Sequence, residues 1–574
     1  MPTFSNYVYA NTAADAQALT GLAAGQLVAT GGYHAVGDGG GFLYRFATTR
    51  SDAGRKDELA VTAGGFLAPM DDLLVVNPVR WGVKQGPQSD NSNTQRIDDV
   101  LAYLLDAAGA RTEGYGGIIA FPPGRFELNI NLNGVNNMRS VGIVGAGRGP
   151  TVLKNRASEL AKPVIYRERT ISGHAILSLQ NLRVWAQGEV QGAAVSLCSS
   201  GPGTGRVWGS LRDVLFVHDS RAQPVLEIYA GIEMVLDKVI TDEGGLGLLL
   251  EEGTSCLVDS FHATHAASGI WILRGGHHLL NTPRIENDLG LNGYTRGAPF
   301  DDIKTYGLRI TDSGLNQVIG FGEEGGEHVE WGLVVEGSAT NPLNVTGQAG
   351  AAISNRIVSS SFNRPRDYQA GQARGSILVR GHVHRLSVEG RVVNASQLAP
   401  DPPSEPLYPT VRISGWQAPA SGEAPFPTDI HIEGVDDKDF GDVAPIFDIA
   451  PQARAVRIRS FWFKKGRWMT AGEVKHLTAG YTLKPVESGF GFTNQGATTV
   501  VTISLPAADP GVEYQFFSVS GQALRVDPTS TQEIRGGGPG KYLELAAGAT
   551  ATLKCVVPGV WEIVAAFGTL VREP

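Results

Sequence analysis

The stretch Gly247-Leu248-Leu249-Leu250, closed by Gly253, decides the fold because the chain repeats it. It recurs as Gly269-Ile270-Trp271-Ile272 with Gly275, and as Gly307-Leu308-Arg309-Ile310 with Gly314. Repetition at a period of this length indicates a repeat architecture. The first apolar residues of successive copies, called anchors below, are Leu226, Leu248, Ile270, Leu308, Leu333, Ile377 and Val411, with spacings of 22, 22, 38, 25, 44 and 34.

Each copy alternates with a period of two, which predicts a short strand with two apolar side chains on one face. A second short strand follows, such as 256–258 or 317–319. A unit this small cannot bury its own apolar face, so the copies must stack. The pattern predicts an all-β, right-handed parallel β-helix. Leucine-rich repeats fit less well because their Asn/Cys ladder is missing, and frequent glycine argues against helical repeats.

Composition excludes several classes of protein. With 574 residues, 42% hydrophobic and 18% charged, the chain is not disordered, and 74 glycines indicate many turns. Three distant cysteines exclude a disulfide scaffold and a Cys-rich metal module. A net charge of −9 without a basic block argues against nucleic-acid binding. The chain shows no signal peptide and no long apolar run, so we expect a soluble protein that is neither inserted in a membrane nor exported by the usual route.

The segments outside the repeats suggest three domains. Residues 1–76 form a small head domain, 77–470 the β-helix, and 471–574 a C-terminal β-sandwich of four or more strands. An amphipathic helix near 94–108, with Asn93 or Thr94 as its N-cap, precedes the first rung. We expect this helix to cap the open end of the coil and to shield its unpaired strand edge.

The order of these segments resembles one family. The head turn Gly37 to Gly41 with its aromatic strand, Pro78-Val79-Arg80-Trp81-Gly82-Val83, the polar run 90–94, the helix and Gly117 to Gly124 resemble the start of pectate-lyase-like β-helix proteins. More narrowly, they resemble bacteriophage tailspikes, although Lys84 to Ser89 departs from the family's Asp-rich pattern. The stretch 492–497 with Leu505-Pro506 is similar to the terminal β-domain of tail fibres and tailspikes.

The resemblance implies a homotrimeric protein of the virion, on the phage tail. Its β-helix would bind and depolymerise a bacterial surface polysaccharide: capsule, exopolysaccharide or O-antigen. The head of about 76 residues is short for a virion anchor, so attachment through an adaptor or another tail protein is expected. A fold resemblance does not define the chemistry, which must come from the site.

A column of polar residues is the candidate site. Residues at equal offset from the anchors should lie above one another, about 4.8 Å apart per rung. Offset 16 places Asp242, Thr264, Glu286 and Glu324 on four successive rungs. The predicted substrate-binding residues lie at neighbouring offsets, in an insertion near 289–305 and between two anchors: Arg284, His262, His265, Glu323, Tyr294, Arg296 and Trp271.

Glycoside hydrolysis uses two carboxylates, ~5 to 5.5 Å apart with a covalent nucleophile or ~6.5 to 9.5 Å apart with a water between them. Glu286 and Glu324 on adjacent rungs fit the shorter range, and Asp242 with Glu286, about 9.6 Å apart, lies at the edge of the longer one. We predict an endo-glycoside hydrolase with Glu286 as acid and Glu324 or Asp242 as base or nucleophile. The alternative is that these are ordinary surface carboxylates of an acidic solenoid.

Other functions stay open. A polysaccharide lyase would use a base near Arg284, or a histidine, to take the proton next to a uronate carboxylate. Arginine or Ca²⁺ would neutralise that carboxylate, but no Asp cluster suited to Ca²⁺ is evident. His262 with His265, and His277 with His278, lack a third ligand, so no metal and no cofactor are predicted. Trp271 would be a sugar platform or a subunit contact. A non-enzymatic receptor-binding fibre and a secreted bacterial lyase or epimerase are the further alternatives.

Overall fold

The computed structural model describes most of the chain, in two compact units, Met1–Leu378 and Val379–Pro574. The predicted division at 76 and 470 stays a prediction. The described residues are 7–50, 56–70, 75–105, 116–201, 204–286, 294–295, 300, 302–324, 329–338, 351–362, 375–393, 411–416, 426–436, 447–450, 453–462, 467–484, 487, 489–507, 510–519 and 521–574.

The first unit begins with a small sheet in the order β1-β2-β3-β5-β4. The predicted glycine-rich turn is closed by Asp38, whose carboxylate accepts backbone N–H groups of Tyr33, His34, Ala35 and Gly40 at 2.6–3.1 Å. The predicted aromatic strand follows as β3. The elements are β1 (Tyr7–Ala10), α1 (Ala13–Gln17), β2 (Leu27–Thr30), β3 (Leu43–Ala47), β4 (Leu59–Ala60) and β5 (Phe66–Pro69).

The rest of this unit is a parallel β-helix, as predicted. The anchors pair in the expected register, because Leu226 lies beside Leu248, Leu248 beside Ile270, and Ile270 beside Leu308. All of them are fully buried inside the coil. The anchor-bearing sheet runs from β9 (Ile130–Asn131) through β12 (Ile165–Arg167), β15 (Val195–Leu197), β17 (Pro224–Tyr229), β19 (Leu246–Thr254), β22 (Ile270–Gly276) and β25 (Tyr306–Gly314) to β28 (Trp331–Gly337).

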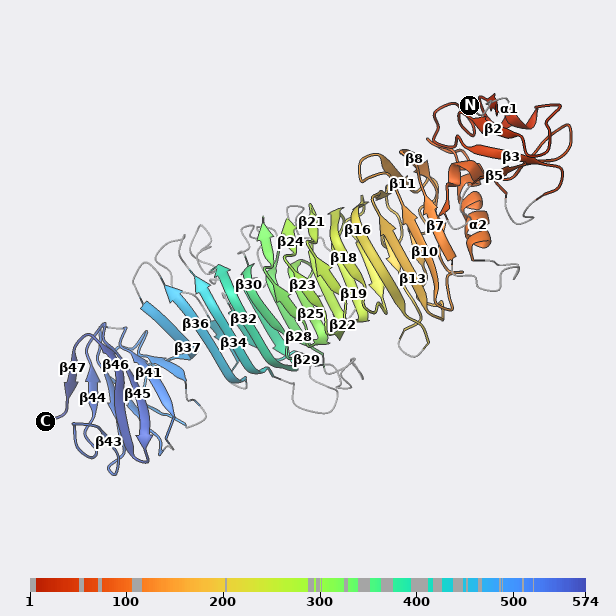
Figure 1. Ribbon diagram of the computed structural model, residues 1–574. Coiled ribbons are helices and arrows are strands. Elements are labelled where there is room, and N and C mark those ends of the chain that lie inside the picture. The colour runs from red at the N-terminus through yellow and green to blue at the C-terminus, as the bar shows by residue number, and fades with distance from the viewer. Residues whose placement is uncertain are drawn as a thin grey trace, which may run out of the picture. The chain divides into compact units, whose positions relative to one another are not determined.

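A second series of parallel strands closes each rung, and Figure 1 shows these strands side by side. Where a rung bends, one long strand is replaced by two short ones, as when β18 pairs with both β20 and β21. The series comprises β6 (Val75–Val76), β7 (Gly116–Ala120), β8 (Gly124–Glu127), β10 (Arg139–Val144), β11 (Thr151–Lys154), β13 (Ala175–Gln180), β14 (Arg183–Ala186), β16 (Val207–His218), β18 (Val235–Glu243), β20 (Leu257–Asp259), β21 (His262–Thr264), β23 (Leu279–Asn281), β24 (Arg284–Glu286), β26 (Gln317–Ile319), β27 (Gly322–Glu324), β29 (Ala352–Ile353) and β30 (Arg356–Phe362).

One corner of the coil carries a ladder of buried side chains. The residue before each ladder position has a positive φ: 56° at Ser255, 60° at His277, 60° at Leu315 and 54° at Ser354. The side chain on one rung then accepts the backbone N–H of the rung before it. These bonds are Cys256 N to His278 Nδ1 at 3.2 Å, His278 N to Asn316 Oδ1 at 3.1 Å, and Asn316 N to Asn355 Oδ1 at 3.3 Å. We call these four residues the corner ladder.

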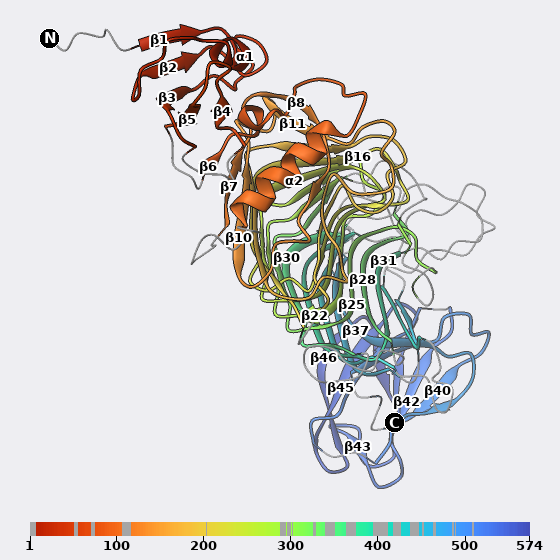
Figure 2. The same ribbon diagram turned by 90° about the vertical axis from the view of Figure 1, so that its right-hand side faces the viewer.

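Helix α2 (Ser92–Leu104) covers the N-terminal end of the coil (Figure 2), after the 3₁₀ turn η1 (Pro78–Trp81). Its apolar face, including Ile97, Val100, Leu101 and Leu104, is buried as predicted. The predicted N-cap is wrong, because the cap residue is Asn91 and makes no side-chain cap bond. Asn93 instead donates to the carbonyl of Glu127 at 3.1 Å, which anchors the helix to the first rung.

The second unit begins with further parallel pairs. β32 (Val383–Val393) pairs with β34 (Thr428–Asp436), β34 with β36 (Arg454–Trp462), and β33 (Val411–Ser414) with β35 (Phe447–Ile449). The parallel stack ends where β37 (Arg467–His476) pairs with β36 in the antiparallel sense. β31 (Gly375–Gly381) carries the anchor Ile377 at the boundary between the units.

The second unit ends in two sheets around one core, which is the arrangement of a β-sandwich. Phe492, Tyr514 and Trp561 from one sheet meet Val501 and Leu524 from the other. The first sheet contains β37, β39 (Phe490–Thr493), β41 (Glu513–Phe517), β45 (Thr550–Val557), β46 (Val560–Phe567) and β43 (Glu533–Ile534), and the second β38 (Tyr481–Thr482), β40 (Val501–Ser504), β42 (Leu524–Asp527), β44 (Leu543–Leu545) and β47 (Leu570–Arg572).

Candidate functional site

The strand register brings the predicted polar residues together on the outside of the coil. Asp242 pairs with Thr264, and Glu286 pairs with Glu324, so the four rungs stack as the spacing predicted. The side chain of Glu324 lies outside the described residues. The remaining outward residues form what we call the carboxylate–histidine column: Asp242, His262, Thr264, His265 and Glu286.

Within this column, one rung supplies a histidine to each carboxylate. His265 Nδ1 lies 2.9 Å from Asp242 Oδ1, and the Thr264 hydroxyl donates to the same oxygen at 2.9 Å. On the other side, His262 Nε2 lies 3.2 Å from Glu286 Oε1. The side chain of Asp242 is 28% exposed and that of Glu286 is 38% exposed. Asp242 is therefore held by two hydrogen bonds, Glu286 lies against a histidine, and both carboxylates are open to solvent.

Next to the column, Glu243 shows the effect of neighbouring carboxylates. Its pKa is raised, first by burial and then by the charges of Asp219 and Asp242. Burial and like charge therefore favour the protonated form of Glu243.

Two predicted binding residues occupy opposite sides of the strands. Arg284 is exposed and lies beside His262 in the register, so it belongs to the outer face. Glu323 lies beside Ile285 and is only 3% exposed, so its prediction as a sugar contact is a misplacement that the structure corrects. The physical reason is the period of two: offset 15 points inward between offsets 14 and 16. The absence of a side chain at Gly332 leaves room for this buried carboxylate.

Trp271 points outward from the coil but is covered. Its indole N–H donates to the Thr311 hydroxyl at 2.9 Å, and the Arg309 guanidinium lies 4.5 Å from its ring centroid. The rings of Tyr294 and Phe300 pack edge-to-face on it, and Trp271 has no exposed surface. Trp271 and Tyr294 therefore stabilise the insertion, and Trp271 is not available as the predicted exposed platform or subunit contact. Arg296 lies outside the described residues.

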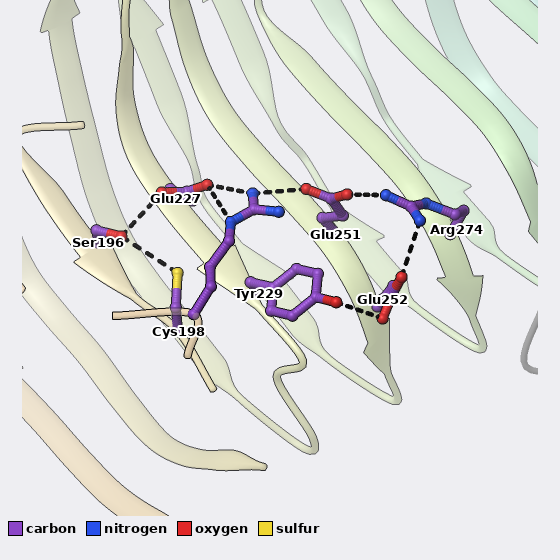
Figure 3. Close-up of polar contacts among 8 residues, drawn as sticks. Ser196, Cys198, Glu227, Tyr229, Glu251, Glu252 and Arg274 are labelled. Atoms are coloured by element: carbon purple, nitrogen blue, oxygen red, sulfur yellow. Dashed lines mark hydrogen bonds and ion pairs between the residues drawn. The ribbon is translucent and has the colours of Figure 1, made fainter. Parts of the chain in front are cut away.

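A second charged cluster, which the sequence analysis missed, lies on the outer face of the anchor-bearing sheet (Figure 3). Arg169 contacts Glu227, with Nε at 3.1 Å, and Glu251 at 2.6 Å. Arg274 contacts Glu251 and also Glu252, the latter at 2.9 Å. We call these residues, together with Tyr229, the arginine–glutamate network.

Hydroxyl and thiol groups complete this network. The Tyr229 hydroxyl donates to Glu252 at 2.7 Å, and the Ser196 hydroxyl donates to Glu227 at 2.8 Å. Burial and the bond to Glu252 raise the pKa of Tyr229 to about 12. Burial also raises the pKa of the Cys198 thiol. At neutral pH both groups keep their protons, so neither is suited to act as a base.

Burial and pairing favour a structural role for the network. Glu251 has no exposed surface, and it lies between two guanidinium groups that stay charged. Burial alone would lower the pKa of Arg169, but Glu227 and Glu251 outweigh it and raise that pKa. A signal for the network was present in the sequence, because Glu227 is the outward residue between the apolar pair Leu226 and Ile228.

Among the described residues, no group of three His, Cys, Asp or Glu side chains is arranged to hold a metal ion. No described helix is both long and apolar enough to span a membrane.

The fold and the site define an all-β, parallel β-helix protein with solvent-open carboxylates on its outer face. No family model and no curated protein matches the chain. Many of the solved structures that match are phage tailspikes, the class that the sequence resembles. The tailspike gp42 of Acinetobacter phage vb_AbaP_AS12 is 10% identical, with 99% of this chain and 94% of that chain covered and a TM-score of 0.43.

Two further structures illustrate the range of these matches. The enzymatically active domain of tailspike protein 2 from bacteriophage CBA120 is 13% identical, covering 98% of this chain and 79% of that chain, with a TM-score of 0.43. Tailspike gp49 of Acinetobacter baumannii bacteriophage Fri1, described as a capsular polysaccharide depolymerase, is 10% identical, covering 99% and 91%, with a TM-score of 0.38.

Proposed function

We propose that this protein is a phage tailspike that binds a bacterial surface polysaccharide and cleaves it as an endo-glycoside hydrolase. The observation that carries the proposal is the carboxylate–histidine column, in which two open carboxylates lie two rungs apart on a rigid coil. Their rung separation of about 9.6 Å is at the upper edge of the range in which a water fits between acid and base.

In this proposal, Glu286 is the general acid and Asp242 is the general base. His265 and Thr264 hold one oxygen of Asp242, which orients the carboxylate toward an attacking water. His262 lies against Glu286, with its Nε2 3.2 Å from the carboxylate. Glu324, on the rung after Glu286, is the alternative nucleophile, and it would give retention instead of inversion.

A lyase is the second candidate, because Arg284 lies beside His262 on the outer face. The guanidinium would neutralise a uronate carboxylate while the imidazole removes the neighbouring proton. A fibre that only binds its receptor is the non-enzymatic alternative.

One experiment separates these candidates. Wild-type protein, Glu286→Gln and the control Glu189→Gln are incubated with purified surface polysaccharides from candidate hosts. Chain length, new reducing ends and the ultraviolet absorbance of unsaturated uronates are followed. New reducing ends without absorbance, lost only in Glu286→Gln, support the hydrolase. Absorbance supports the lyase, and binding without shortening supports the fibre.

The proposal includes a homotrimer on the phage tail, attached through an adaptor. Exposed apolar side chains near the C-terminus support self-association: Phe567 is 62% exposed, Val564 51% and Val571 48%. Apolar residues on exposed strands favour pairing with another chain. The solution mass is expected to be three times that of one chain and to fall in Phe567→Ser. A monomeric wild type would rule out the trimer.

A further inference from the structure

The outer face that carries the carboxylates continues toward the N-terminus. Lys154 pairs with Trp185, Trp185 with Val217, and Val217 with Asp242. Trp185 therefore lies on the same line of the register as Asp242 and Glu286, with Val217, which is only 2% exposed, between Trp185 and Asp242. It is two rungs, or about 9.6 Å, from Asp242, and four rungs, or about 19 Å, from Glu286.

Trp185 is held in a fixed orientation and is half-buried, unlike the covered Trp271. Its indole N–H donates to Asp219 Oδ1 at 2.7 Å, and the other oxygen of Asp219 accepts the backbone N–H of Gly188 at 2.8 Å. The neighbouring outward line carries half-buried apolar residues, because Leu215 pairs with Ile240 on the following rung. An oriented indole beside apolar side chains suits the CH-rich face of a sugar ring.

Two arginine guanidinium groups lie over the ring of this indole. The guanidinium carbon of Arg125 is 5.2 Å from the ring centroid, and that of Arg183 is 5.3 Å from it. They are two rungs apart, with Val152 between them in the register. Within the described part of the chain, neither forms a direct ion pair with a carboxylate, and Arg125 acts on Glu127 only at longer range, whereas Lys154 is paired with Glu127 at 2.6 Å.

The positive charge of these guanidinium groups indicates which kind of sugar this surface would bind. The chain has a net charge of −9, so an acidic polymer is repelled by the protein as a whole. A neutral sugar needs no positive charge beside its stacking platform. A carboxylate matches guanidinium groups in both charge and geometry.

We infer that Trp185, Arg125 and Arg183 form a subsite for a sugar unit that carries a carboxylate. The sugar ring packs on the indole, and its carboxylate lies between the two guanidinium groups. The inference rests on the proposed function, because it places this unit on the polymer that reaches Asp242 and Glu286. It makes the substrate an acidic polysaccharide and makes the subsite a determinant of specificity.

The test compares one polymer in two forms: a glucuronate-containing capsular polysaccharide and the same polysaccharide with its carboxylates reduced to alcohols. Binding is measured for wild type, Arg125→Gln, Arg183→Gln and Trp185→Leu, with the exposed Arg212→Gln on β16 as the control. We expect each subsite variant to bind the acidic form about tenfold more weakly, from the loss of a charged hydrogen bond or a stacking contact. Wild type should bind the reduced polymer about tenfold more weakly than the acidic polymer. On the reduced polymer, the arginine variants should bind almost as tightly as wild type.

Several outcomes would overturn the subsite. Equal binding of both polymer forms by wild type would do so, as would unchanged binding by Arg125→Gln, whose exposed side chain leaves the coil intact. A smaller assembly in Arg125→Gln would assign these residues to a subunit contact instead. Cleavage of only neutral polymers would leave the proposed function standing and remove this subsite, whereas no binding of any polymer would remove both.

Discussion

Two groups of carboxylates lie on the outside of the same coil and differ in their partners and burial. In the carboxylate–histidine column, Asp242 and Glu286 are open to solvent and contact histidines. In the arginine–glutamate network, Glu251 is fully buried between two guanidinium groups. Arginine stays protonated, so its carboxylate partners are permanently neutralised, whereas histidine can release its proton near neutral pH. The partner residue therefore separates carboxylates suited to acid–base chemistry from those that hold the coil together.

The largest expected effect is on activity. Replacing Glu286 by Gln removes the proposed general acid and should slow polymer shortening by about 10² to 10⁴-fold. The melting temperature should stay close to that of wild type, because the side chain is 38% exposed. Glu252→Gln in the network is the matched control and should keep its activity. Loss of cleavage in Glu252→Gln but not in Glu286→Gln would reverse the roles assigned to the two groups.

The next effect is on stability. Glu251→Gln removes the carboxylate that two partly buried arginines share, while Glu227 and Glu252 still pair with them, and should lower the free energy of unfolding by about 1.5–3 kcal/mol. Denaturant midpoints at pH 7 measure this loss. Glu189→Gln, on the surface, should stay within about 0.5 kcal/mol of wild type. If both variants unfold at the same midpoint, the network contributes nothing to the coil.

Acid should destabilise the protein through the buried His278 of the corner ladder. Burial lowers the pKa of His278 to about 4, below its ordinary 6.5. The unfolded state therefore binds the proton first, and stability falls as the pH drops from about 6.5 to about 4, by about 3 kcal/mol. His278→Asn should flatten this part of the profile, because Asn316 and Asn355 already fill the equivalent ladder positions.

His218 should add a smaller loss of stability as the pH falls, because burial lowers its pKa as well. Unfolding profiles from pH 4 to 7 for wild type and His278→Asn check the assignment. An undiminished acid loss in His278→Asn would place the sensitive group elsewhere.

The smallest effect concerns Tyr229. Tyr229→Phe removes one hydrogen bond to Glu252 and should cost about 1 kcal/mol. Because the folded pKa is raised to about 12, the hydroxyl keeps its proton at pH 7 and at pH 9, and the cost should be equal at both. The contribution disappears only as the pH rises from about 10 through 12. A cost that already differs between pH 7 and pH 9 would contradict the protonated donor.

The coil was predictable because its repeat is local. Anchors 22 residues apart, such as Leu226 and Leu248, fixed the register, and the register fixed which residues stack with Asp242. Offsets do not show what covers a residue, so Trp271 was placed on the correct face without the insertion that buries it. The network joins Arg169 to Glu227 across 58 residues, over rungs whose spacing shows no clear repeat.

Two predictions made from neighbouring residues alone, the helix cap and one sugar contact, were wrong. Asn93 has the residue type of a helix cap, yet its amide bonds to the first rung. Glu323 was placed in the site because its neighbours belong there, although a shift of one residue along a strand reverses the face.

The corner ladder keeps successive rungs aligned whatever the number of residues in each rung. Ser255 and His277 are 22 residues apart, and His277 and Leu315 are 38 apart. Each corner nevertheless has a residue in the left-handed conformation and the same type of hydrogen bond between rungs. The corners of successive rungs therefore stay aligned, while the number of residues between two corners varies. Loop lengths between rungs can therefore change in evolution while the outward residues, such as Asp242 and Thr264, keep their spacing.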